Sequence, residues 1–300
     1  MSCDKGEVNN ALELEKKADQ RGIKADDNDG PWVKNGQGVL LASRWIPSKS
    51  YLFRQITDTE MDLPLAGAGG SSTEMSMDVR VDVKKVDGSS NKNIKIGFDK
   101  VKMSMQMAGQ NMVYDSENPD NQNPLLKTAL SSLNDQTYDA TFDENNKILS
   151  FEGEDDGAGN GIGMGAMGKA EIENMIQQLK DFGSPETVVQ PNASWQSKQD
   201  FKMQQIGEMK MTIDYIYKGP VEFSGKKLAA IDFEGKAETN GEGLVSFKDS
   251  KMNGTLLFDP QLGMLIESET KMKMTMSIGG ASGAEMDTTT TTKNNLISVE

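Results

Sequence analysis

The sequence VKMSMQM, residues Val101–Met107, has an apolar side chain at every second position and a polar one between. Because successive side chains of a β-strand point to opposite faces, this alternation predicts a strand with one face against a core and the other in water. Similar segments occur at Met75–Val83, Met209–Ile213 and Met272–Met276. Together they predict one antiparallel sheet with a methionine-rich face.

Two stretches interrupt this pattern with helical spacing. The first begins at Asn123-Pro124, where an asparagine cap followed by proline is a common start of a helix. The second is predicted over Lys169–Phe182, and its apolar side chains form one stripe that must cover something apolar. The members of this stripe are Ile172, Met175, Ile176 and Leu179. The expected fold class is therefore mainly β (α+β): a strongly curved antiparallel sheet, or half-barrel, with two short helices packed on its concave face.

The domain organisation follows from shifts in composition. Residues 1–30 are rich in Lys, Glu, Asp and Asn with few large apolar residues, so we expect a disordered tether. Residues 31–300 are expected to form a single curved-sheet domain. Residues 45–152 and 187–300 both contain long strands and a Phe-Asp turn, which suggests two similar halves. A glycine-rich loop and the second helix, residues 153–186, would join them.

Turns and irregularities are predicted from glycine and from the phase of the apolar pattern. Between Phe98 and Val101 the apolar phase slips by one residue, which predicts a bulge or bend at Asp99-Lys100. In the second half, turns are expected at four glycine-containing pairs. These are Gly219-Pro220, Ser224-Gly225, Asn253-Gly254 and Gly279-Gly280.

Composition excludes several classes of function. A formal net charge of −14 repels phosphate backbones, so nucleic acid is not an expected partner. The chain contains no histidine, which removes Ser-His-Asp and Cys-His catalysis and imidazole-bound zinc. Its carboxylates fall on no recognisable catalytic or metal-ligand framework. We therefore expect no enzymatic activity, no cofactor and no metal, and the lack of any run of 18 apolar residues predicts no membrane-spanning helix.

Cys3 is the single cysteine of the chain and lies within three residues of its start. A polar tract follows it, as in a mature bacterial lipoprotein whose first residue is a lipid-modified cysteine. This interpretation predicts lipidation at Cys3 and a location in the bacterial cell envelope, lipid-anchored on the periplasmic side, or secretion. A lipid anchor would be the only contact with the membrane. The alternative, a chance terminal cysteine on a cytoplasmic protein, stays open.

Three short segments carry a resemblance to a known family. They are WIPSKSYLF (Trp45–Phe53), VYDS (Val113–Ser116) and VVQPNASW (Val188–Trp195). From about Trp45 to its end, the chain resembles an uncharacterised family of secreted bacterial lipoproteins. That family is similar in fold to the lipoprotein carriers LolA and LolB, in which helices partly cover the concave apolar face of a curved sheet. The resemblance brings no catalytic residues with it.

The 20 methionines lead to the functional hypothesis. Methionine is flexible and polarizable, so a methionine-rich concave face suits a lipid, an acyl chain or another hydrophobic ligand of variable shape. The second helix would act as a displaceable cover, because a glycine run precedes it. The predicted groove residues are Met75, Met77, Met103, Met105, Met107, Met209, Met211, Met272, Met274 and Met276.

Other interpretations of the same residues stay open. Methionine is also an ordinary filler of apolar cores. A curved sheet with exposed edges could serve as a structural or protein–protein interaction module of the envelope. Thioethers from neighbouring strands could bind Cu(I), for which soft ligands are selective. A monomer is expected in each case.

Overall fold

The computed structural model describes residues 30–33, 37–62, 70–86, 88–107, 109–118, 120, 122–144, 147–153, 169–180, 182–185, 187–203, 207–239, 245–278 and 284–300. Cys3 and nearly all of the predicted tether lie outside the described residues. The pair Gly279-Gly280 and the glycine run before the second helix also lie outside them.

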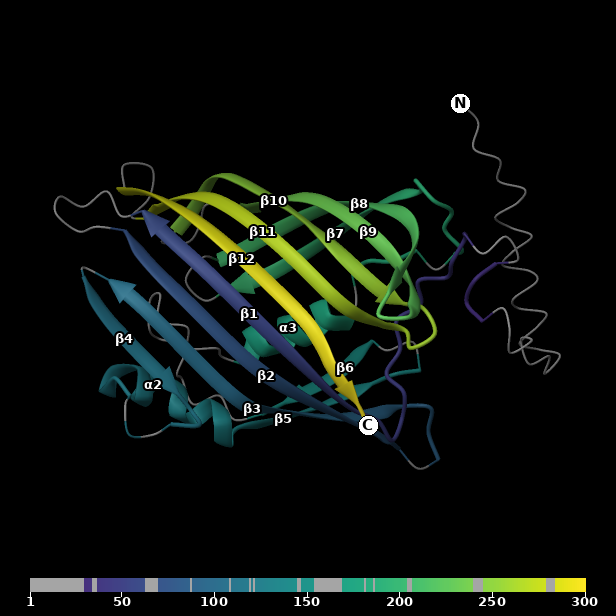
Figure 1. The fold of residues 1–300 in the computed structure, drawn as a ribbon, viewed down its shortest axis with the longest axis horizontal. Coiled ribbons are helices and arrows are strands. Elements are labelled where there is room, and N and C mark those ends of the chain that lie inside the picture. Colours follow the sequence, from purple (N-terminus) through teal and green to yellow (C-terminus); the bar gives the residue numbers. More distant parts are fainter. Residues whose placement is uncertain are drawn as a thin grey trace.

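One large antiparallel sheet dominates the described chain, as predicted, and it is not closed (Figure 1). The strands of the first half are β1 (Ser50–Asp62), β2 (Ser71–Lys85), β3 (Lys92–Met107), β4 (Gln110–Asp115), β5 (Thr137–Phe142) and β6 (Ile148–Glu152). Those of the second half are β7 (Ser194–Met203), β8 (Gly207–Phe223), β9 (Lys226–Thr239), β10 (Val245–Asp259), β11 (Met264–Ile278) and β12 (Ala284–Val299). They lie in the order β6-β5-β3-β2-β1-β12-β11-β10-β9-β8-β7, and β4 also pairs with β3.

Two short helices complete the described architecture: α2 (Pro124–Asp135) and α3 (Lys169–Lys180). The predicted cap holds, because the Asn123 side-chain oxygen accepts a hydrogen bond from the backbone N–H of Leu125 at 2.9 Å. Helix α2 contacts β3 and β4, whereas α3 contacts β7 and β11. In the part of the chain that is described, no helix combines the length and hydropathy that crossing a membrane requires.

The first and last strands pair with each other and join the two halves of the chain. β1 and β12 pair in antiparallel fashion from Tyr51 opposite Val299 to Asp62 opposite Asp287. Strands β2 to β6 therefore form one wing of the sheet, and β7 to β11 form the other (Figure 1). The junction of the wings, which we call the seam, brings together residues more than 200 positions apart in sequence.

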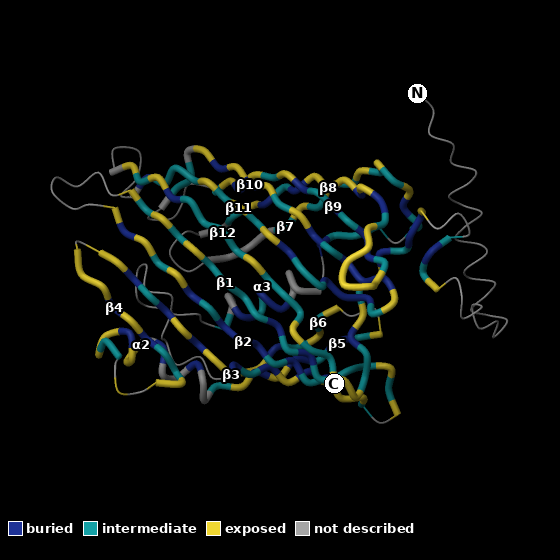
Figure 2. The backbone as a smooth tube through the Cα atoms, in the orientation of Figure 1, coloured by how far each residue is buried: buried dark blue, intermediate teal, exposed yellow. Residues whose placement is uncertain are grey.

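The predicted bulge in β3 is present. Lys100 pairs with Asp78 and Phe98 pairs with Val79, so Asp99 is the extra residue of the bulge. The extra residue keeps Phe98 and Val101 on the same buried face, although they are an odd number of positions apart. Buried and exposed positions alternate along the strands on both sides of such irregularities (Figure 2).

Two of the predicted turns are wrong. β8 continues through Gly219-Pro220, where the register shifts and Gly219 has a φ of 121°. β10 continues through Asn253-Gly254 without a turn. A glycine inside a strand often marks a bulge or a close approach of a neighbouring group rather than the end of the strand. Ser224-Gly225 does form the predicted turn, between β8 and β9.

The buried apolar residues form two separate cores. The first contains the inner faces of β1 to β5 with α2 and α3, including Phe53, Leu126 and Ile176. The second contains the inner faces of β8 to β11, and Phe182, which follows α3, lies within it. In the second core the Phe182 ring lies 5.5 Å from that of Phe258 and 6.0 Å from that of Tyr215.

The segment before β1, residues 37–49, packs against both wings. Val39 and Val189 exchange two backbone hydrogen bonds of 3.0 and 2.9 Å, and Val39 belongs to the second core. Further along, Trp45 belongs to the first core, where its ring meets the edge of Tyr51 at 5.2 Å. The hydroxyl of Tyr217 donates to the backbone oxygen of Gln37 at 2.7 Å, and burial raises the pKa of this tyrosine above its usual range.

Candidate functional site

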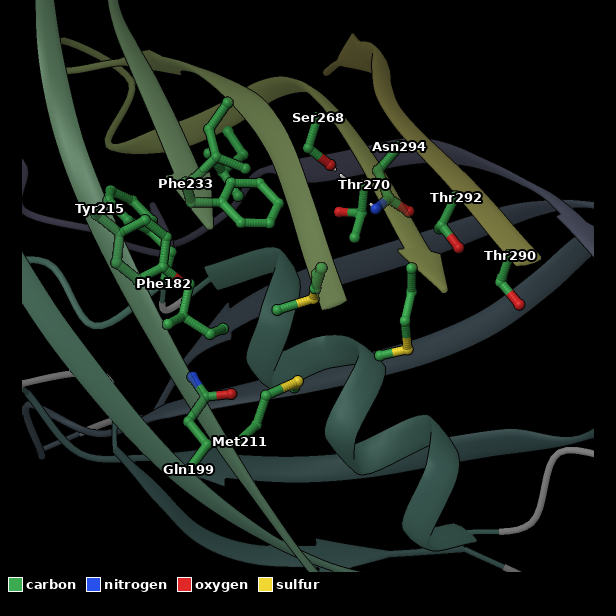
Figure 3. Close-up of a pocket in the computed structure, with 15 residues that line it drawn as sticks. Phe182, Gln199, Met211, Tyr215, Phe233, Ser268, Thr270, Thr290, Thr292 and Asn294 are labelled. Carbon is green, nitrogen blue, oxygen red and sulfur yellow. Dashed lines mark hydrogen bonds between the residues drawn. The ribbon is translucent and has the colours of Figure 1, made fainter. Parts of the chain in front are cut away.

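A partly open pocket with a cavity volume of about 220 Å³ lies on the inner face of the second wing, beside Phe182. One side of the pocket is apolar and includes Met211, Phe233 and Met272. Hydroxyl and amide side chains from β11 and β12 form the other side, and helix α3 passes next to the pocket (Figure 3). These polar residues are Ser268, Thr270, Thr290, Thr292 and Asn294.

The pairing of the strands places the two kinds of side chain next to each other. Met272 of β11 lies between Met252 of β10 and Thr290 of β12, and Thr290 in turn pairs with Thr59 of β1. Paired residues point to the same face of a sheet, so this row passes from thioethers to hydroxyls within one strand spacing. The pocket therefore lies where the apolar face of the second wing meets the seam.

Two glycines shape the apolar side. A Cβ atom on Gly254 would lie 2.5 Å from the Cζ atom of the Phe233 ring and would also collide with the backbone oxygen of Glu269. A Cβ atom on Gly235 would lie 3.1 Å from the Cε atom of Met252. The missing side chains let the Phe233 ring and the Met252 methyl lie close to the backbone of neighbouring strands, which leaves room above them.

The polar side extends along the seam as a series of hydrogen-bonded pairs, which we call the polar ladder. Its members are Gln55, Thr57 and Thr59 of β1, Ser268 of β11, and Thr290, Thr292 and Asn294 of β12. Gln55 Nε2 donates to Asn294 Oδ1 at 2.9 Å, and Asn294 Nδ2 donates to Ser268 Oγ at 3.1 Å. The hydroxyls of Thr57 and Thr292 lie 3.4 Å apart, and those of Thr59 and Thr290 lie 3.3 Å apart.

The sequence patterns did not predict the polar ladder. Thr288 to Thr292 are five consecutive threonines, so the segment has no contrast between apolar and polar positions from which an inner face could be assigned. The pairing of Asn294 with Gln55 depends on the register of β1 and β12, which no local pattern reveals. A weak signal does exist, because a run of β-branched hydroxyl residues is typical of strands.

The ten predicted groove methionines divide into three groups. Met211 and Met272 line the pocket, together with Met252, which the alternation pattern missed. Met75, Met77, Met103 and Met105 are buried in the first core, so they contact protein. Met209, Met274 and Met276 are half-buried, and Met107 is 46% exposed at the end of β3, beyond the buried part of that strand.

The predicted cover helix lies inside the molecule. Ile172 and Ile176 are fully buried and Met175 is 5% exposed, all in the first core, while the side chain of Leu179 lies outside the described residues. Three buried side chains of this kind contribute on the order of 5–9 kcal/mol. The described lining of the pocket contains no residue of α3.

Charged groups lie away from the pocket. Among the described lining residues none is Asp, Glu, Lys or Arg. Ion pairs such as Arg54–Asp78, with contacts of 2.7 and 2.8 Å, lie on the opposite face of the first wing. There, hydrogen bonds from Lys100 and Lys102 lower the pKa of the Glu117 carboxyl. Within the described ranges, no group of three or more His, Cys, Asp or Glu side chains could hold a metal ion.

One family model matches part of the chain. The "Family of unknown function (DUF6263)" matches residues 89–188, which is one third of the chain. No curated protein matches the sequence.

Several solved structures are distantly similar. Lipovitellin, in a structure that concerns lipid–protein interactions, aligns over 86% of this chain with 11% identity and a TM-score of 0.49, and this chain covers only 26% of it. A Bacteroides fragilis protein of YmcC-like fold, described as exported, aligns over 87% of this chain and 99% of its own, with 9% identity and a TM-score of 0.28. An outer membrane channel from Pseudomonas putida F1 aligns over 91% of this chain and all of its own, with 6% identity and a TM-score of 0.23. At these values the similarities carry no argument about function.

The packing around Gly254 yields a stability prediction. Gly254→Ala should lower the free energy of unfolding by about 1–3 kcal/mol, because the added methyl group collides with the Phe233 ring and the Glu269 backbone. Gly97→Ala in β3 is the matched control, since its nearest neighbour would be the Thr137 methyl at 4.0 Å. The control should be neutral or stabilising by up to about 1 kcal/mol. Urea denaturation measures both, and equal effects would contradict the close packing at Gly254.

Proposed function

We propose that this chain is a non-enzymatic protein of the bacterial cell envelope that binds the hydrocarbon chain of a lipid in the pocket of the second wing. The observation that supports this best is the pocket itself: a cavity of about 220 Å³ whose described lining combines flexible thioethers with aromatic rings and contains no charged group. Pockets that bind small apolar molecules have this chemistry. Three methionines, Met211, Met252 and Met272, can adjust to chains of different shape.

The size of the cavity limits the affinity. At about 30 Å³ per water-sized group, it holds about seven such groups. Seven buried methylenes would contribute about 5–6 kcal/mol, which corresponds to a dissociation constant between millimolar and micromolar before any polar contact is added. The pocket therefore suits part of an acyl chain, with the rest of the ligand extending along the seam or into solvent.

The envelope location is supported by the chemistry of the N-terminal sequence. Cys3 followed by a long polar tract has the composition of an anchor and spacer in a lipoprotein. A tethered protein with an apolar pocket could receive a lipid from the membrane or release one into it.

Filling the pocket tests the ligand-binding proposal. Thr270→Trp adds a large ring to the described lining, and Lys271→Trp adds the same ring to the opposite, exposed face of β11. Thr270→Trp should weaken binding of the uncharged dye N-phenyl-naphthylamine at least about tenfold, because it removes most of the cavity that supplies the binding energy. Lys271→Trp should bind the dye as the parent does. If the parent does not bind the dye, or both variants bind it equally, this pocket is not the ligand site and an interaction module becomes the better interpretation.

Fractionation of cells tests the anchor. In cells that produce the full-length precursor, Cys3→Ala should move the protein from the membrane fraction to the soluble fraction, because the substituted residue has no thiol to acylate. Cys3→Ser is a second variant that keeps nearly the size of the side chain and replaces the thiol by a hydroxyl. Retention of both variants in the membrane fraction, as strong as that of the parent, would rule out Cys3 as the anchor.

A further inference from the structure

We propose that the polar ladder selects an uncharged, oxygen-bearing head group, so that the ligand is a neutral acyl ester such as a monoacylglycerol rather than a fatty-acid anion or a phospholipid. This inference rests on the proposed function, since it names the ligand class of the same pocket. It starts from the juxtaposition seen in Figure 3, where the polar side chains of β11 and β12 face the apolar side of one cavity. A ligand in that cavity touches both surfaces.

The polar ladder has hydrogen-bonding capacity left over. A primary amide has two N–H donors and a carbonyl with two acceptor positions. Within the described chain, Asn294 uses one donor toward Ser268 and accepts one bond from Gln55. The threonine pairs at 3.3 and 3.4 Å are long for hydroxyl–hydroxyl bonds, which are typically 2.7–2.8 Å apart. Hydroxyls held in this way can turn toward a better partner.

Two further hydroxyls continue the same surface and have no hydrogen-bond partner among the described residues. Thr288 is 5% exposed and lies on the same face of β12 as Thr290, because alternate residues of a strand share a face. Thr73 of β2 pairs with Thr59 of the polar ladder, and its Oγ1 atom is likewise buried and unpartnered. Natural proteins rarely leave buried polar groups unsatisfied. Both hydroxyls lie beyond the residues that line the pocket, so they extend the polar surface along the inner face of the seam.

The absence of charge from the described lining determines which head group fits. Proteins commonly bind carboxylate or phosphate anions with Arg, Lys or helix N-termini, and no Arg or Lys is among the described residues that line this pocket. Burying an unpaired anion is costly, and a protein of net charge −14 adds long-range repulsion. A hydroxyl group, by contrast, can both donate to and accept from Thr, Ser, Asn and Gln side chains, and an ester carbonyl can accept from them.

Competition between lipids with one acyl chain and different head groups tests this selection. N-phenyl-naphthylamine is bound to the full chain and displaced by monooleoylglycerol, by oleate or by lysophosphatidylglycerol carrying the same oleoyl chain, all below their micellar concentrations. We expect monooleoylglycerol to displace the dye at a concentration at least about tenfold lower than either anion does. A difference in affinity of this size corresponds to one or two hydrogen bonds together with the avoided burial of a charge.

A matched pair of double variants assigns the selection to the polar ladder. Thr290→Val with Thr292→Val removes two hydroxyls from the pocket at nearly constant shape, whereas Thr289→Val with Thr291→Val makes the same change on the opposite face of β12. The first pair should reduce the preference for monooleoylglycerol over oleate, measured as the ratio of their displacing concentrations within the same variant, by about three- to tenfold. The second pair should keep the parent's preference.

The possible outcomes separate the two proposals. If the dye binds in the pocket and oleate displaces it as well as monooleoylglycerol does, the head-group selection is wrong and the hydrophobic pocket stands. A preference that survives the Thr290 and Thr292 substitutions also overturns the role of the polar ladder. If neither the dye nor any lipid binds, both proposals are wrong.

Discussion

The antiparallel pairing of β1 with β12 is the interaction on which the rest of the structure depends. Each wing is built mainly from hairpins, with α2 between β4 and β5, whereas the seam joins residues at opposite ends of the described chain. Closing such a long loop costs conformational entropy before any contact compensates for it. Cross-strand threonine and amide pairs each contribute roughly 0.2–1 kcal/mol, and together they favour this register of the two strands.

The seam also explains why the molecule has two apolar cores. Phe53 and Leu296 pair across one end of the seam and join the first core, but the inner face is polar from Gln55 to Thr59 of β1 and from Asn294 to Thr288 of β12. Most apolar side chains on either side of this polar surface pack with their own wing, whereas Met264 of β11 joins the first core. A cavity remains where the second wing meets the seam, because the glycines of β9 and β10 draw Phe233 and Met252 toward the sheet. The candidate site thus results from the register of β1 and β12, the polar inner face of the seam and the two glycines of β9 and β10.

The fold could be predicted from the sequence to a large extent, because its signals are local. Alternation identified the strands, Asn123-Pro124 marked the start of α2, and the phase slip before Val101 located the bulge at Asp99. Non-local information was missing. Asn253-Gly254 has the composition of a turn, yet Gly254 serves the contact with Phe233 on a neighbouring strand, which a one-dimensional pattern does not contain. For the same reason Met103 and Met272 look alike in sequence, although one is core and the other lines the pocket.

Native mass spectrometry of the protein purified from the envelope of its own host tests the central claim most directly. The account predicts a complex of one protein chain with one neutral acyl lipid, released as an uncharged glyceride or related ester when the complex is dissociated. Its occupancy should fall in Thr270→Trp, which fills the described pocket, and persist in Lys271→Trp. A parent protein that carries no lipid, or one that carries an anionic lipid equally in both variants, would contradict the account.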